Sequence, residues 1–226
     1  MANMEAALRY HEHWKRAAEL KVEHQECKFR PLEVKALASI FPDGLRRGTI
    51  AEIAGARSTG RTSLACHILG QSTGRGEVCA TVDLHNSFSP ELAAQAGVQL
   101  ERMVWVRCGG NAEAALRATD LLLHAGGFGI VHLDLCEGDP RQLNRIPLSS
   151  WYRFRRVLEN TSTVLLVCTD SSQAKSFAWR CLEAKSQVIS WLGNHSFPVL
   201  GGLTTDAVSG KLAPIRPQSL FWRVAG

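Results

Sequence analysis

The sequence contains no apolar run long enough to cross a membrane. Its first residues lack the apolar stretch and the small-residue cleavage site of a secretion signal. The seven cysteines are scattered and form no C-x-x-C pair, which disfavours both a disulfide framework and a zinc site. These absences predict a protein of the reducing cytoplasm without a membrane partner.

The composition is that of a globular protein. The chain has 226 residues, of which 45% are hydrophobic and 21% are charged. This length suits one domain of ordinary to large size with its own apolar core. The formal net charge of +5 is compatible with binding to nucleic acid but does not require it.

A glycine-containing segment lies between an apolar stretch, residues 49–54, and a helix-like stretch, residues 64–70. Strand, glycine loop and helix in this order are the context of a phosphate-binding loop. The glycines allow backbone N–H groups to curl around an anion, and the helix directs its positive dipole end to the same place. In that reading the hydroxyl of Thr62 would ligate magnesium. The predicted nucleotide-binding residues are Gly55, Ala56, Arg57, Ser58, Thr59, Gly60, Arg61, Thr62 and Ser63.

One residue departs from the phosphate-loop pattern. The motif G-x-x-x-x-G-K-[ST] has lysine where this chain has Arg61. Lysine is a compact point charge, whereas arginine is a larger planar fork, so Arg61 cannot bind a phosphate in the same pose. The alternative interpretation is an ordinary glycine- and serine-rich turn between a strand and a helix.

Further along, Val-, Ile- and Leu-rich stretches alternate with amphipathic ones. This alternation predicts an α/β fold in which a mostly parallel sheet carries helices on both faces. We expect an N-terminal helical arm and connector over 1–44, a core over 45–186, and short C-terminal strands continuing the sheet over 187–226. Further strands are expected at 77–83, 103–107, 130–135 and 163–169, and helices at 90–96, 112–124, 149–158 and 171–185.

Polar residues follow several of the expected strands. The glycine loop, His85, Asp134 and Asp170 all come at carboxyl ends, which is where open parallel sheets bind ligands. This convergence favours the phosphate loop over the ordinary turn. Asp134 closes an apolar strand, as does the carboxylate that holds the magnesium shell in nucleotide-binding proteins. Its alternative role is that of a helix-capping or loop aspartate.

The residues that carry these features resemble a known group. The order of the glycine loop, Val82–Pro90, Ile130–Asp134 and Thr163–Asp170 resembles the RecA-like P-loop ATPase core. The segments Trp105–Cys108, Ala118–Gly129 and Arg145–Arg156 resemble the ImuA family of shortened RecA-like proteins in damage-induced mutagenesis. The similarity extends from about Leu45 to Lys185.

The resemblance implies an accessory role in the SOS response to DNA damage and in error-prone translesion synthesis. The implied partners are an ImuB-type inactive Y-family polymerase, an error-prone replicative-type polymerase, and RecA itself. A RecA-type core also implies head-to-tail homo-oligomers, in which a terminal arm docks on the neighbour. Residues 1–26 could serve as such an arm or could pack on their own domain.

Departures from RecA imply weak or absent ATP hydrolysis. By the resemblance, the RecA glutamate that activates water corresponds to His85, and the glutamine that senses the γ-phosphate corresponds to Asp170. Loss of a general base costs about 10²–10⁴-fold in rate. ATP with Mg²⁺ remains the cofactor the loop could hold, although none is required. The alternatives are an active DNA-dependent ATPase or recombinase and, less well matched, a division inhibitor of the SulA type.

Basic residues near the two loops that bind DNA in RecA suggest non-specific contact with DNA phosphates. The second of these loops is expected to be almost absent, because residues 171–175 lead directly into an expected helix. The alternative is a solvated basic helix face. The candidate DNA-binding residues are Arg141, Arg145, Arg153, Arg155, Arg156 and Lys175.

Overall fold

The computed structural model describes residues 44–192, 199–209 and 218–223, with side chains up to residue 185. Of the expected N-terminal arm and connector over 1–44, residues 1–43 lie outside these ranges. Within the described residues, no helix has the length and apolar character needed to span a bilayer. The elements are β1 (Ile50–Gly55), α2 (Arg61–Gly74), β2 (Val78–Asp83), α3 (Pro90–Gln95), η1 (Leu100–Arg102), β3 (Met103–Arg107), α4 (Ala112–Ala125), β4 (Phe128–Asp134), α5 (Pro140–Leu143), α6 (Leu148–Leu158), β5 (Val164–Thr169), η2 (Lys175–Phe177), β6 (Ala178–Leu192), β7 (Val199–Ser209) and β8 (Gln218–Arg223).

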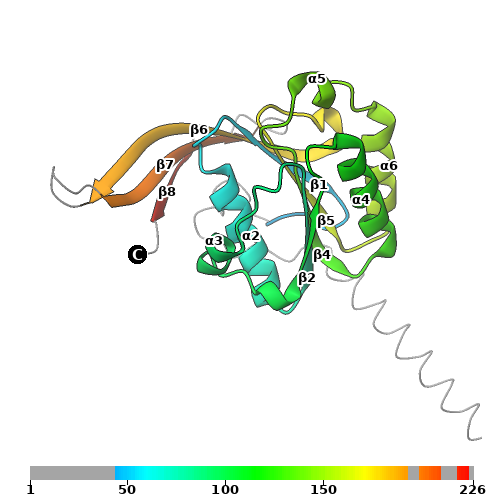
Figure 1. The fold of residues 1–226 in the computed structure, drawn as a ribbon, viewed down its shortest axis with the longest axis horizontal. Helices are drawn as coiled ribbons and strands as arrows, with labels where there is room; N and C mark the ends of the chain where they lie inside the picture. The colour runs from blue at the N-terminus through cyan, green and yellow to red at the C-terminus, as the bar shows by residue number, and fades with distance from the viewer. Residues whose placement is uncertain (1–43, 193–198, 210–217, 224–226) are drawn as a thin grey trace, which may run out of the picture.

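A single eight-stranded sheet organises the molecule, in the order β3-β2-β4-β5-β1-β6-β7-β8. The first six strands in this order pair in parallel, whereas β7 and β8 pair antiparallel. Helices α2 and α3 lie on one face of the parallel part, and α4 and α6 lie on the other (Figure 1). The expected α/β class with helices on both faces is therefore confirmed.

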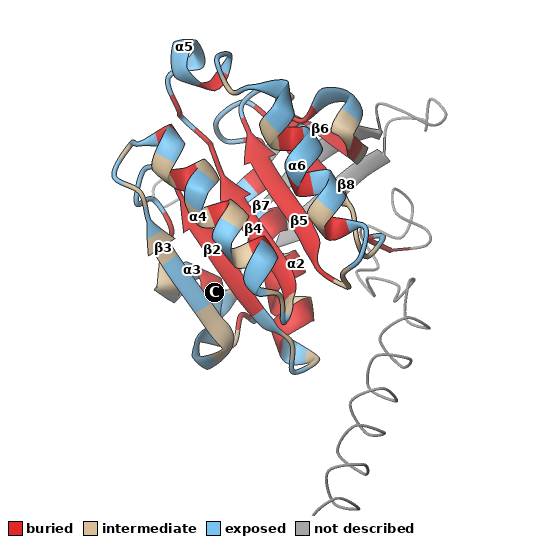
Figure 2. Cartoon of the chain, turned by 90° about the vertical axis from the view of Figure 1, so that its right-hand side faces the viewer, coloured by how far each residue is buried: buried red, intermediate tan, exposed pale blue. Residues whose placement is uncertain are grey.

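Strands β1, β2, β4 and β5 bury both of their faces, which explains their continuous apolar sequences. In β5, Leu165 and Val167 pack toward α4 and α6, whereas Leu166 and Cys168 pack toward α2. This separation follows from the two-residue period of a strand. Figure 2 shows the buried strands beneath helices whose outer surfaces are exposed.

A capping residue and a row of large apolar side chains position α4 and α6 on their face of the sheet. The side chain of Asn111 caps α4 by accepting a hydrogen bond from the N–H of Ala114 at 3.0 Å. Helix α6 buries Trp151, Phe154 and Leu158, which recur at helical spacing. These large side chains fix α6 to the sheet beside α4.

The expected helix over residues 171–185 is wrong. The chain makes only the short η2 turn there and then enters β6, which pairs in parallel with β1 from Ala178 onward. Ala, Leu, Glu and Lys in this stretch favour a helix locally, but the open side of β1 offers a full ladder of backbone hydrogen bonds. Strand β6 consequently crosses the expected domain boundary at residue 186.

At the other side, β3 is the end strand of the sheet within the described residues. Its Trp105 donates from Nε1 to Oδ2 of Asp83 at 3.1 Å and packs against Phe88. The guanidinium of Arg107 lies 5.1 Å from the centre of the Trp105 ring. The indole is thereby held on the edge of the sheet, although it is 36% exposed.

Candidate functional site: a glycine loop with its own counter-charges

The glycine loop connects β1 to α2 in a tight turn. Gly60 has φ 83° and Ser58 has φ 66°, so the chain passes twice through left-handed backbone conformations. A Cβ at Gly55 would lie 2.6 Å from the carbonyl oxygen of Ala184, which makes glycine necessary there. The hydroxyl of Thr59 donates to the carbonyl oxygen of Ala56 at 2.8 Å and stabilises the turn.

Arg61, the residue that departs from the phosphate-loop pattern, does not point into solvent. Its side chain is only 5% exposed, and Nη1 donates to both the carbonyl oxygen of Gly55 and Oδ1 of Asp170. A buried guanidinium needs a counter-ion, and Asp170 provides it from the carboxyl end of β5. Two of the three positions expected to depart from RecA, Arg61 and Asp170, thus bind each other.

A second arginine of the loop is also paired. Arg57 makes a two-pronged contact with Glu137, in which Nε lies 3.0 Å from Oε1 and Nη2 contacts Oε2. The hydrogen bond and charge of Arg57 hold the pKa of the Glu137 carboxyl below its usual range. The backbone N–H of Glu137 donates to Oδ2 of Asp170 at 2.8 Å. The two ion pairs are therefore joined into one network.

His85 follows β2 in a loop that Asp83 organises. The carboxylate of Asp83 accepts hydrogen bonds from the N–H groups of Ser87 at 3.1 Å and Phe88 at 2.9 Å. His85 itself is exposed, and its charge contributes to the lowered pKa of Glu137. The structure therefore places His85 at the same end of the sheet as the glycine loop, as expected from the sequence.

The two residues expected to hold magnesium lie at this end as well. Thr62 is exposed in the first turn of α2, and Asp134 ends β4 with 7% exposure. One oxygen of Asp134 already accepts the N–H of Cys136 at 3.0 Å. In the described part of the chain, no three or more His, Cys, Asp or Glu side chains gather as a metal site. A magnesium ion would therefore depend on phosphate or water oxygens for most of its ligands.

Glu52, a carboxylate in the middle of the apolar strand β1, was not among the residues predicted from the sequence. Glu52 is 1% exposed. It accepts hydrogen bonds from the N–H groups of Gln173 at 2.6 Å and Ala174 at 3.1 Å, and from the hydroxyl of Ser172 at 2.7 Å. The link between β5 and β6 is thus anchored to the sheet. A lone carboxylate in an apolar run was the available signal.

The six candidate DNA-binding residues do not form one cluster. Arg145 and Arg153 line a cavity of about 660 Å³ between the start of α4 and α6, and Arg153 also pairs with Asp120 at 2.8 Å. Arg141 is exposed in α5, whereas Lys175 lies in η2, before the start of β6. Arg156 on α6 donates to the hydroxyl of Tyr152 at 3.4 Å.

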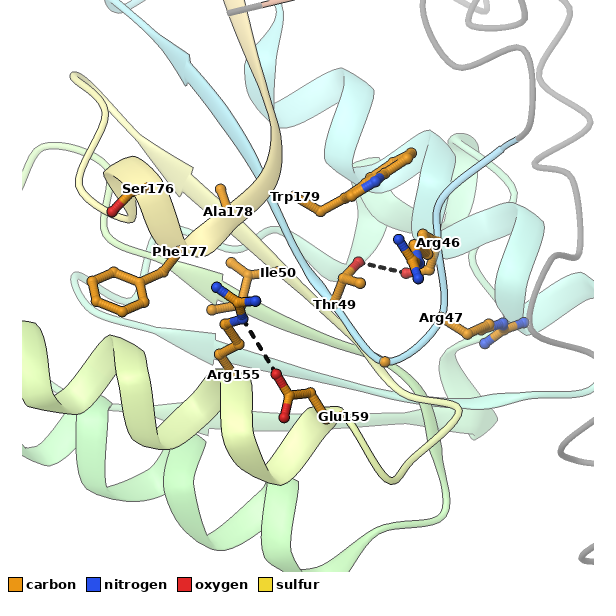
Figure 3. A pocket seen from close by; sticks show the side chains of 11 residues that line it. Arg46, Arg47, Thr49, Ile50, Arg155, Glu159, Ser176, Phe177, Ala178 and Trp179 are labelled. Atoms are coloured by element: carbon orange, nitrogen blue, oxygen red, sulfur yellow. Dashed lines mark hydrogen bonds and ion pairs between the residues drawn. The ribbon is translucent and has the colours of Figure 1, made fainter. Parts of the chain in front are cut away.

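Arg155 lines a different cavity, of about 360 Å³, at the amino end of the sheet (Figure 3). In this view Arg155 faces Glu159, and their Nε and Oε1 atoms are 3.4 Å apart. Ile50, which also lines this cavity, is the first residue of β1, and Gly55 of the glycine loop is the last. The cavity and the glycine loop therefore lie at opposite ends of the sheet. The basic residues are therefore distributed over opposite ends of the sheet.

The fit of MgATP to this site is mixed. The turn at Gly55 and Gly60 and the uncapped start of α2 suit a phosphate. The side chains do not, because Arg57 and Arg61 already bind carboxylates, and Glu137 and Asp170 would add negative charge beside a triphosphate. The loop thus has a backbone turn that suits a phosphate, but the cationic side chains at these two positions are bound to carboxylates.

Part of this chain is similar in sequence to RecA proteins. The family model of the RecA N-terminal domain matches residues 30–138. The RecA proteins of Brucella anthropi and Brucella melitensis biotype 1 are each 35% identical to this chain over 91 residues, or 40% of it. The matched part spans a quarter of the length of these relatives.

The fold has a counterpart among solved structures. A crystal structure of the RadB recombinase superimposes with a TM-score of 0.60 and covers 84% of this chain and 94% of its own. Its sequence identity to this chain is 17%, so this likeness concerns the fold alone. Residues 30–138 are therefore similar in sequence to the RecA N-terminal domain, and the described core has a RecA-like fold.

Proposed function

We propose that this RecA-like protein is an accessory scaffold of error-prone translesion synthesis in the SOS response to DNA damage, with weak or absent ATPase activity. The observation that carries the proposal is the Arg61–Asp170 ion pair, in which the arginine at the lysine position of the phosphate-loop motif binds a carboxylate of the chain. The similarity of segments 118–129 and 145–156 to the ImuA family supports the same role.

The proposed partners are an ImuB-type inactive Y-family polymerase, RecA and an error-prone replicative-type polymerase. The proposed location of these interactions is the cytoplasm. Contact with DNA would be non-specific, through the separate basic surfaces at Arg145 and Arg155. The anchored β5–β6 link argues against a mobile second DNA-binding loop. Homo-oligomerisation is also proposed, on the basis of the RecA-like core.

An active DNA-dependent ATPase is the second candidate. The observation that favours it is the arrangement of the glycine loop, His85 and Asp134 at one end of the sheet, which keeps the layout of a nucleotide site. A magnesium ion shared by Thr62, Asp134 and the phosphates would complete such a site.

Two measurements on the purified full-length chain separate these functions. Capture of the ImuB-type polymerase or RecA by the immobilised chain, together with no ATP turnover above background, is the result expected for a scaffold. Phosphate release that single-stranded DNA stimulates, and that Asp134→Ala abolishes, would instead identify an ATPase. Capture of the cell-division tubulin alone would favour a division inhibitor.

A further inference from the structure

The glycine loop is tied to two neighbouring strand ends by a continuous set of polar contacts. Arg61, in the first turn after the loop, binds Asp170 beyond β5, and Arg57, within the loop, binds Glu137 beyond β4. The N–H of Glu137 donates to Oδ2 of Asp170 at 2.8 Å and closes the set. Three loops that are far apart in sequence are therefore joined at one end of the sheet.

The charges in this set balance. Two guanidinium groups face two carboxylates, and the network includes the carbonyl oxygen of Gly55, which accepts a hydrogen bond from Arg61. The Arg61 side chain is 5% exposed, so its charge depends on this partner more than that of Arg57, which is 77% exposed. An incoming triphosphate would have to replace these carboxylates or lie beside them, and like charges at close range disfavour binding.

We infer that Asp170 and Glu137 serve as built-in substitutes for nucleotide phosphate, so that the glycine loop is held closed and charge-balanced without ATP. This role of the two carboxylates rests on the weak or absent ATPase activity proposed above, but not on which partners the scaffold recruits. Both carboxylates are positioning residues: Asp170 holds Arg61 at the start of α2, and Glu137 holds the tip of the loop.

The test measures the equilibrium binding of a fluorescent ATP analogue, in the presence of Mg²⁺, to the full chain. Binding is detected by the fluorescence anisotropy of the analogue. The variants are Asp170→Asn, Glu137→Gln and the double variant. Asn and Gln keep the size and an acceptor oxygen but remove the charge. Glu159→Gln is the matched control, because Glu159 also pairs with an arginine but lies at the opposite end of the sheet.

We expect the wild-type chain and Glu159→Gln to bind the analogue equally weakly. Asp170→Asn should bind at least about tenfold more tightly, since removing a like charge beside a bound anion relieves a repulsion of that order or more. Glu137→Gln should show a smaller gain in affinity, because the Arg57–Glu137 pair is more exposed to solvent. The double variant should show the largest gain in affinity. The melting temperature with and without the analogue provides a second readout.

Two results would overturn the inference. One is wild-type binding as tight as that of the double variant. The other is a folded double variant that binds the analogue no more tightly than the wild-type chain, or whose gain in affinity is also seen in Glu159→Gln. If Asp170→Asn does not fold, Glu137→Gln decides alone, with the same expected direction. Neither result bears on capture of the polymerase or RecA, so failure here and failure of the scaffold function can be told apart.

Discussion

Glu52 offers a direct test of what anchors the β5–β6 link. In Glu52→Met the side chain keeps its length but loses both acceptor oxygens. The buried N–H groups of Gln173 and Ala174 then have no carboxylate to bind. Each buried donor left unsatisfied costs about 1–3 kcal/mol, so the expected loss in the free energy of unfolding is about 2–6 kcal/mol. A domain is typically stable by about 5–15 kcal/mol, which makes this a large fraction.

Urea denaturation measures this loss, and amide hydrogen exchange at residues 173 and 174 locates it. Glu52→Gln, which retains one acceptor oxygen, should lose about 1 kcal/mol. The matched control is Glu183→Met on the neighbouring strand β6, where the side chain is exposed and the change should stay within about 0.5 kcal/mol. Glu52 does not anchor the β5–β6 link if Glu52→Met is as stable as Glu183→Met and exchange at residues 173 and 174 is unchanged.

Two further predictions concern buried titratable groups. Burial lowers the pKa of His132, so the unfolded chain binds more protons below about pH 6.5 and stability should fall as the pH drops below that value. This change in the free energy of unfolding is at most about 1.4 kcal/mol per pH unit, and it can be followed by urea denaturation from pH 7 to pH 5. The pH dependence should be weaker in His132→Leu, and an equal pH dependence in the two proteins would contradict this prediction. Burial also raises the pKa of Cys66 to about 11 and that of Cys181 to about 12. Cys108 is only half-buried and Cys27 lies outside the described residues, so both are replaced with Ser to isolate the buried thiols. The Cys27→Ser/Cys108→Ser variant should react with a thiol reagent at pH 8 far more slowly when native than when unfolded, and equal rates would show that the remaining thiols are accessible.

Most of the parallel core could be predicted from the sequence, because its signals are local. The expected strand 103–107 coincides with β3, and the expected helix 149–158 differs from α6 by one residue. Residues 171–185 could not be assigned correctly, since their conformation depends on β1, which lies more than 120 residues earlier. Helix propensity is too weak to resist such a pairing partner.

The candidate site was predictable only in part. The positions of the glycine loop, His85 and Asp134 at one end of the sheet followed from strand order and the parallel rule. The partner of Arg61 did not, because an ion pair across 109 residues leaves no periodic pattern in the sequence. Asp170 was expected at the position of the residue that senses the γ-phosphate, whereas the structure shows that its carboxylate binds Arg61.

The position of Trp105 on β3 affects how the protein behaves at high concentration. An end strand with exposed apolar side chains can act as a template on which other chains add strands and aggregate. Here the guanidinium of Arg107 lies over the Trp105 ring and places a positive charge at the end of that strand. Two copies that met edge to edge would bring these charges together, so Arg107 favours a colloidally stable protein. Its cost to folding is small, because the arginine stacks on the indole that it covers.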